Sequence, residues 1–207
     1  MLKLDENHVY HLGTEILPGT TQILGEYIRT ELYGEVWWVH TPTGAAIADH
    51  IMQRAAEIGT AIHKIAFYVF TGAGIDIKSL SPTLLAPYEQ IFKFVQQYKP
   101  QVILCEVPLH SQKYRYAGTL DLFAKLKGFR KPVLVDIKTG MSHLVGPQTA
   151  SYEHLVHENK YRGNIERTLL RIPKDGSEYT FTPLRRRDDW NYFYYRLQNY
   201  NWLQKAA

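Results

Sequence analysis

Residues 132–140 read PVLVDIKTG. An apolar run of this length, bounded by Pro132 and Gly140, predicts a buried β-strand. Side chains alternate between the two faces of a strand, which gives two sets: Val133, Val135 and Ile137 on one face, and Leu134, Asp136 and Lys138 on the other. An acid and a base therefore share a face that begins apolar, which indicates a site rather than a core strand alone.

The composition predicts one soluble globular domain. The chain has 207 residues, of which 45% are hydrophobic and 21% charged, and this balance argues against disorder. The longest apolar run, residues 65–70, is far below the about 18 residues that a membrane span needs. Residues 1–13 lack the apolar core of a signal peptide, and the lone Cys105 excludes an internal disulfide framework. We therefore expect a cytoplasmic protein.

The formal net charge of +4 is mild, but the basic residues are unevenly distributed. They form two clusters in the sequence: Lys125, Lys127, Arg130 and Lys131, and then Arg185, Arg186 and Arg187. Clusters of this kind are either solvated loop charge or the contact surface for an anionic partner.

Hydrophobic periodicity and turn signals predict a mixture of helices and strands. We expect helices over residues 45–70, 82–98, 147–157 and 187–205, and strands over residues 102–109, 116–126, 132–139, 165–172 and 178–184. Residues 1–45 are rich in turn signals and read as an N-terminal extension to a core of residues 46–207 within one domain. The order predicts an α/β or α+β sandwich.

Two aspartates are expected to meet in this sheet. A short turn joins the strands 116–126 and 132–139, and Asp121 and Asp136 lie symmetrically about its midpoint, between Gly128 and Phe129. In a regular hairpin their Cβ atoms would stand roughly 4.5–5.5 Å apart, where like charges are destabilising. A shared proton or a hard divalent cation would relieve that repulsion.

Lys138 follows on the same face and could stabilise charge on a phosphate or orient a water molecule. The alternative is a surface ion pair between Asp136 and Lys138 at a frayed strand end, worth about 0–1 kcal/mol.

Neighbouring elements offer further candidate residues. Gly59 and His63 are four apart on one helix face, where Gly59 would let the helix approach the sheet closely and His63 could bind a metal. Gln148 and Tyr152 are also four apart, and they would either contact a phosphate or form a solvent-facing pair. Glu106 interrupts an apolar strand and is a further candidate ligand or substrate contact.

The order of these residues resembles the PD-(D/E)xK nuclease superfamily, within it the RecB-like and phage-exonuclease branch. The matching motifs are Gly59-Thr60-x-x-His63, residues 106–109 (EVPL), Gly118-Thr119-x-Asp121, residues 136–140 (DIKTG) and Gln148-x-x-x-Tyr152. The N-terminal His8-x-Tyr10 and residues 17–24 (LPGTTQIL) are similar to phage members, so the resemblance spans nearly the whole chain.

The resemblance implies a restriction-endonuclease-like core, a mixed sheet flanked by helices, and a metal-dependent active site. His63, Asp121, Asp136 and the backbone carbonyl of Ile137 would hold Mg²⁺ or Mn²⁺. The catalytic set would comprise Asp121, Asp136, Lys138, Glu106, Gln148 and Tyr152. No iron–sulfur cluster is expected, because the four cysteines that hold one in some relatives are absent.

The resemblance implies a DNA exonuclease of phage or bacterial recombination and DNA processing. A recombination or single-strand-binding protein would be a further partner, and no membrane is expected. Two other readings stay open: a module that binds DNA without cutting it, and a structure-selective endonuclease on the same fold. RNA also remains open as a substrate. Trp37 and Trp38 would either stack on unpaired bases or pack in the core.

Overall fold

A five-stranded mixed sheet forms the centre of the protein. A computed structural model describes residues 1–25, 42–140 and 142–206. The sheet has the order β4-β5-β6-β7-β8, with bounds Gln101–Ser111, Tyr116–Lys125, Val133–Lys138, Glu166–Arg171 and Thr180–Pro183. Strands β6 and β7 run parallel and the other neighbours antiparallel. The chain is thus a mixed α+β fold, as predicted.

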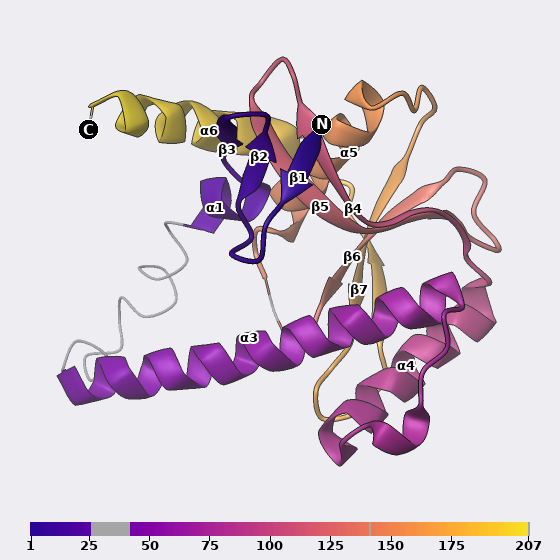
Figure 1. Cartoon of the computed structure of the whole chain (residues 1–207). Helices are drawn as coiled ribbons and strands as arrows, with labels where there is room; N and C mark the ends of the chain where they lie inside the picture. Colours follow the sequence, from indigo (N-terminus) through magenta and orange to yellow (C-terminus); the bar gives the residue numbers. More distant parts are fainter. Residues whose placement is uncertain (26–41, 141, 207) are drawn as a thin grey trace.

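Helices cover both faces of this sheet (Figure 1). On one side lie α3 (Pro42–Thr71) and α4 (Pro82–Tyr98), joined through the short 3-10 helix η2 (Ile77–Ser79). On the other side lie α5 (Val145–Glu158), α6 (Asp189–Ala206) and the short α1 (Thr20–Gly25). Helix α5 is the crossover between the parallel strands β6 and β7, a connection that parallel pairing requires.

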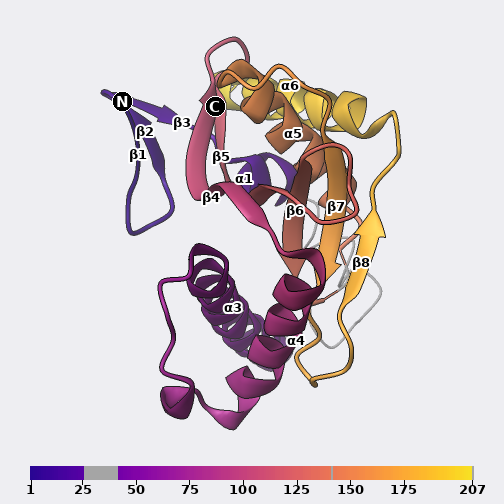
Figure 2. The ribbon, with the colours of Figure 1, turned by 90° about the vertical axis from the view of Figure 1, so that its right-hand side faces the viewer.

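Strand β6 supplies both hydrophobic cores, because its side chains alternate. Val133, Val135 and Ile137 pack in the core beneath α3 and α4, whereas Leu134 packs in the core beneath α5 and α6. All four side chains are buried, as the sequence pattern predicted for this strand. The end-on view of α3 in Figure 2 shows the two helical layers on opposite sides of the sheet.

The predicted hairpin between β5 and β6 is confirmed. The observed pairs are Leu122 with Val135, Phe123 with Leu134, and Ala124 with Val133. This register is centred between Gly128 and Phe129, and its pairs end at Leu122–Val135, one position before Asp121 and Asp136.

The N-terminal residues contain structure that the turn signals did not predict. Three short antiparallel strands, β1 (Leu2–Leu4), β2 (Tyr10–Leu12) and β3 (Glu15–Leu17), form a second small sheet. The backbone N–H of Ala117 in β5 donates to the carbonyl of Pro18, which ties this segment to the main sheet. Strands of three residues carry too little alternation to be recognised from sequence.

Within the described residues, none of the helices combines the length and the apolar character that crossing a membrane would require.

Two glycines differ sharply in their surroundings. A Cβ at Gly118 in β5 would lie 2.6 Å from Cε1 of Tyr152 and 2.8 Å from Oγ1 of Thr20, so a side chain at this position would force its neighbours to shift. At Gly59 nothing outside the helix lies within 4 Å of the added atom. The expectation that Gly59 provides a close approach of α3 to the sheet is therefore wrong, and Gly118 has that role between β5 and α5.

Substituting Gly118 by alanine should therefore destabilise the protein. We expect a loss of about 1–3 kcal/mol in the free energy of unfolding, since the new methyl group overpacks the contact with Tyr152. The matched change Gly59→Ala, in an open helix position, should raise stability by about 0.5–1 kcal/mol. Urea unfolding followed by circular dichroism measures both, and equal midpoints for the two variants would contradict this packing.

Candidate metal centre

Asp121 joins β5 to β6 at the point where their ladder of backbone pairs ends. Beyond the pair Leu122–Val135, the Asp121 carboxylate itself accepts a hydrogen bond from the backbone N–H of Ile137, at 2.6 Å from Oδ2. The side chain of Asp121 is about nine-tenths buried. A carboxylate thus takes the place of a backbone acceptor, and its second oxygen stays available to other groups.

Glu106 stands opposite Asp121 on the other neighbour, β4. The pairs Cys105–Leu122 and Val107–Leu120 on either side set this register. Glu106 has φ of 51°, a left-handed conformation that is strained for a residue with a side chain.

The alternation of both strands changes phase at this pair. In β4, Cys105 packs beneath α3 and α4, whereas Val107 and Leu109 pack on the opposite face. In β5, Leu122 packs beneath α3 and α4, whereas Leu120 packs on the opposite face. Residues two apart should share a face in a regular strand, so Glu106 and Asp121 occupy a local irregularity in the sheet.

His63 of α3 completes a compact group with these two carboxylates. Its Nδ1 lies 3.3 Å from Oδ1 of Asp121 and 3.5 Å from Oε1 of Glu106. One ligand atom from each of the three residues lies within 4.8 Å of the others. An imidazole and two carboxylates at this separation could hold a divalent cation.

The charges in this group are strongly coupled. Burial alone would lower the pKa of His63, but Asp121 and Glu106 raise it to about 10, so an imidazolium sits between the two carboxylates. Burial would raise the pKa of Asp121, yet His63, Lys138 and the Ile137 N–H together lower it. The imidazolium thus neutralises negative charge where a metal ion could do so, and a metal would bind the neutral imidazole.

Asp136 and Lys138 form the second half of the site. Lys138 Nζ lies 2.6 Å from Oδ2 of Asp136, and the Asp136 side chain is fully buried. The alternative of a surface ion pair at a frayed strand end is therefore wrong. Burial raises the pKa of Asp136 to about 6, with Lys138 opposing and Asp121 adding to the rise. Burial lowers the pKa of Lys138, but Asp136 and Asp121 outweigh it and the pKa is raised.

One oxygen of Asp136 is a buried polar atom without a partner. Oδ2 pairs with the Lys138 ammonium, whereas Oδ1 has no hydrogen bond from any described residue. Buried carboxylate oxygens are nearly always satisfied, so Oδ1 could bind a group that the protein itself does not supply. The donor set around Asp136 thus fits a bound cation or water.

Gln148 and Tyr152 of α5 lie on the face of the sheet that α5 and α6 cover. Both side chains are buried, and Gln148 Nε2 donates to the Tyr152 hydroxyl at 2.9 Å. The alternative of a solvent-facing pair is therefore wrong. Burial raises the pKa of Tyr152 well above its ordinary value, and the charges of Asp136 and Asp121 add to the rise, so the hydroxyl stays protonated.

The metal ligands implied by the resemblance are only partly reproduced as one group. His63 and Asp121 lie together, but Glu106 rather than Asp136 is the third member of the compact cluster. For Ile137, the contact found here is made by the backbone N–H to Asp121.

Neither a protein-family model nor a curated protein matches the chain. The assignment of the site therefore rests on the geometry of its own residues.

One contributor to the site was not recognised in the sequence. The hydroxyl of Tyr10, in β2, lies 3.0 Å from Oγ1 of Thr119, two residues before Asp121. Burial raises the pKa of Tyr10, and the charge of Glu106 adds to the rise, which places this ring close to the cluster. Tyr10 and Thr119 are 109 positions apart, and no local pattern connects residues so distant in the chain.

The predicted nucleic-acid-binding residues fall into separate places. Lys131 and Arg185, Arg186 and Arg187 line one cavity of about 810 Å³, although they are far apart in the sequence. Lys125, Lys127 and Arg130 do not belong to its lining. Trp37 and Trp38 lie outside the described residues.

Replacing His63 by alanine should weaken metal binding. We expect the dissociation constant for Mn²⁺, measured by isothermal titration calorimetry, to rise by at least about 10-fold, because a ligand nitrogen is lost. His50→Ala is the matched control, since His50 is an exposed histidine on the same helix, and it should bind Mn²⁺ like the unaltered protein. Equal Mn²⁺ affinity in both variants would exclude His63 as a ligand.

Proposed function

We propose that this protein is a metal-dependent nuclease that hydrolyses phosphodiester bonds in DNA, and that its sheet is a restriction-endonuclease-like core. One observation carries the proposal. The residues singled out by the motifs come from α3, β4, β5, β6 and α5. The charge of Asp136 interacts with His63, Asp121, Lys138 and Tyr152, and its buried Oδ1 has no hydrogen bond from the described residues. Buried carboxylate oxygens without a hydrogen-bond partner are rare in folded proteins.

The metal would be Mg²⁺ or Mn²⁺, held by His63, Asp121 and Glu106, with Asp136 as the further carboxylate beside it. When bound, such an ion polarises a phosphate and lowers the pKa of a coordinated water molecule. The proposal does not need an iron–sulfur cluster, since Cys105 is the lone cysteine of the chain.

Lys138 would act on the phosphate and on the attacking water. Its raised pKa keeps the ammonium charged at neutral pH, and the side chain retains about one-quarter of its exposure. A fixed positive charge in a partly desolvated site stabilises the additional negative charge that the phosphate carries in its five-coordinate transition state. The free oxygen of Asp136 would accept a hydrogen bond from water and so orient it.

Gln148 and Tyr152 would shape the floor beneath the scissile phosphate. Tyr152 is held by its hydrogen bond from Gln148 and by close contact with Gly118. This rigid floor favours a single orientation of the substrate, which is how positioning lowers an activation barrier.

An exonuclease acting in recombination or DNA processing is the activity that the motif order favours. A recombination or single-strand-binding protein would be the matching partner. The reading as a silent DNA-binding module is less well supported, because His63, Asp121, Asp136 and Lys138 are all present and adjacent. A structure-selective endonuclease would use the same groups.

Digestion of end-labelled linear and closed circular DNA, single- and double-stranded, tests the proposal. We expect loss of linear substrates with Mg²⁺ or Mn²⁺, and no loss with chelator. Cutting of circles would indicate an endonuclease instead, and binding without cleavage would favour the silent module. A parallel RNA substrate decides between the two nucleic acids.

Lys138→Ala should reduce cleavage by roughly 100-fold or more, since it removes charge stabilisation at the phosphate. Asp136→Ala should act similarly. Lys93→Ala, an exposed lysine on α4, is the matched control and should cleave normally. Thermal unfolding of each variant confirms that it is folded, and normal cleavage by folded Lys138→Ala would contradict the assigned site.

A further inference from the structure

The cavity of about 810 Å³ lies against the side of α5 that faces away from the candidate metal centre. Its walls come from α5, the start of β7, the segment after β8 and the first turn of α6. The α5 residues in its lining are Ala150, Glu153, His154 and His157. At 100° per residue, these four point roughly opposite to Gln148 and Tyr152. Helix α5 thus separates the cavity from the candidate metal centre.

The cavity is rich in positive charge. Five basic side chains line it against two acidic ones, Glu153 and Glu166, together with two histidines. Lys131, Arg185 and Arg187 are exposed, and the described part of the chain gives none of them an ion pair. Arg186 differs, because it pairs with Asp188 at 3.1 Å.

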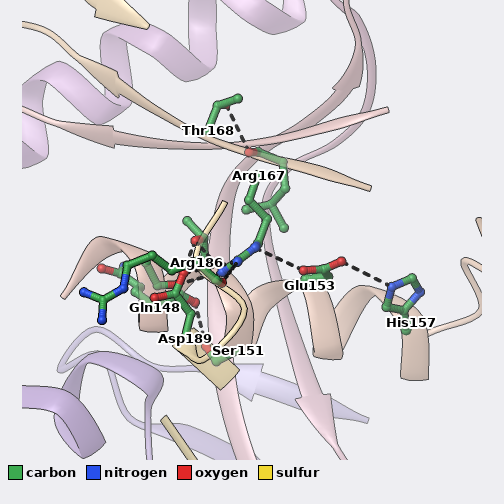
Figure 3. Close-up of polar contacts among 11 residues, drawn as sticks. Gln148, Ser151, Glu153, His157, Arg167, Thr168, Arg186 and Asp189 are labelled. Carbon is green, nitrogen blue, oxygen red and sulfur yellow. Dashed lines mark hydrogen bonds and ion pairs between the residues drawn. The ribbon is translucent and has the colours of Figure 1, made fainter. Parts of the chain in front are cut away.

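Arg167 at the base of the cavity is committed to the protein itself (Figure 3). It forms ion pairs with Glu153 at 3.2 Å and with Asp189 at 3.1 Å. It also donates to the carbonyl oxygens of Gly146 and Arg186. The contact with Arg186 ties the arginine segment to Arg167. Of the two acids in the lining, Glu153 is paired with Arg167, which leaves Glu166 as the acid that opposes the charges of Lys131, Arg185 and Arg187.

The Trp190 ring in the cavity wall packs against other rings of the protein. The Trp190 ring stacks on His154 with centroids 4.2 Å apart and planes 14° apart, and it also lies nearly parallel to Tyr194. Binding by base stacking would need one of these faces. The chemistry that remains available is charge-assisted hydrogen bonding from lysine and arginine to phosphate oxygens.

We propose that this cavity binds the phosphate backbone of a nucleic-acid strand, as a second contact separate from the candidate metal centre. The choice of a nucleic acid as the polyanion rests on the proposed nuclease function. Recognition is independent of base sequence, because only phosphates are contacted. A strand held behind α5 stays attached to the protein while the metal centre acts on another part of it.

Binding of a labelled single-stranded oligonucleotide, followed by fluorescence anisotropy in chelator, tests this site without cleavage. The variant is the double change Arg185→Ala with Arg187→Ala, which leaves Arg186 and its contact to Arg167 in place. The control, Lys78→Ala with Lys93→Ala, removes two exposed charges from the opposite helical layer. Both doubles alter net charge equally.

Each phosphate contact contributes about 0.7 to the slope of the logarithm of the association constant against the logarithm of the salt concentration. Losing two contacts should therefore lower the magnitude of this slope by about 1.4, which corresponds to roughly 20-fold weaker binding at about 0.1 M salt. The control double should lose less than about 3-fold. Equal losses in the two doubles would overturn the proposal. Displacement of the oligonucleotide by inorganic phosphate through these arginines would also overturn it, since the site would then take free phosphate rather than a strand.

The two proposals fail separately. If the unaltered protein cuts no nucleic acid but the arginine double variant still binds the oligonucleotide poorly, the proposed nuclease function is wrong and the proposed strand-binding cavity is supported. If cleavage occurs and both doubles bind alike, the cavity proposal is wrong and the nuclease function stands.

Discussion

The hydrogen bond from the Ile137 N–H to the Asp121 carboxylate is the interaction on which the site depends. It joins two strands where their backbone ladder has ended, and it aims the second oxygen of Asp121 at His63 of α3. The same point carries the phase change of β4 and β5, through the left-handed Glu106. One carboxylate thus connects the sheet, the long helix and the neighbouring acid.

Burying two aspartates with a histidine and a lysine does not maximise the free energy of unfolding. Asp121 and Asp136 are buried close together, and the charge between them is balanced by His63 and Lys138. Apolar residues of similar size would commonly be as stable or more so. Concentrated strain and uncompensated polar atoms are typical of functional sites, where local rules of folding are broken and the rest of the structure compensates.

The elements of the main sheet and its helices were predictable because each carries a long local pattern. Ser81 and Pro82 mark the start of α4, and β6 shows its alternation in six residues. Even the register of the hairpin that carries Asp121 and Asp136 followed from the symmetry of its short turn. By contrast, the three-residue strands of the N-terminal sheet were missed, and Gly59 was given a packing role that belongs to Gly118.

The candidate residues could be found without a structure, since acids, a lysine and a histidine interrupt apolar patterns that are readable over a few positions. How these residues group could not, because it depends on how the elements pack. Glu106 lies beside His63 and Asp121 because of a local irregularity in the sheet. Tyr10 contacts Thr119, which is 109 residues away in the sequence, and Lys131 lines one cavity together with Arg185–Arg187. These contacts depend on sheet order and helix packing, which arise from the summed burial of two cores rather than from any local pattern.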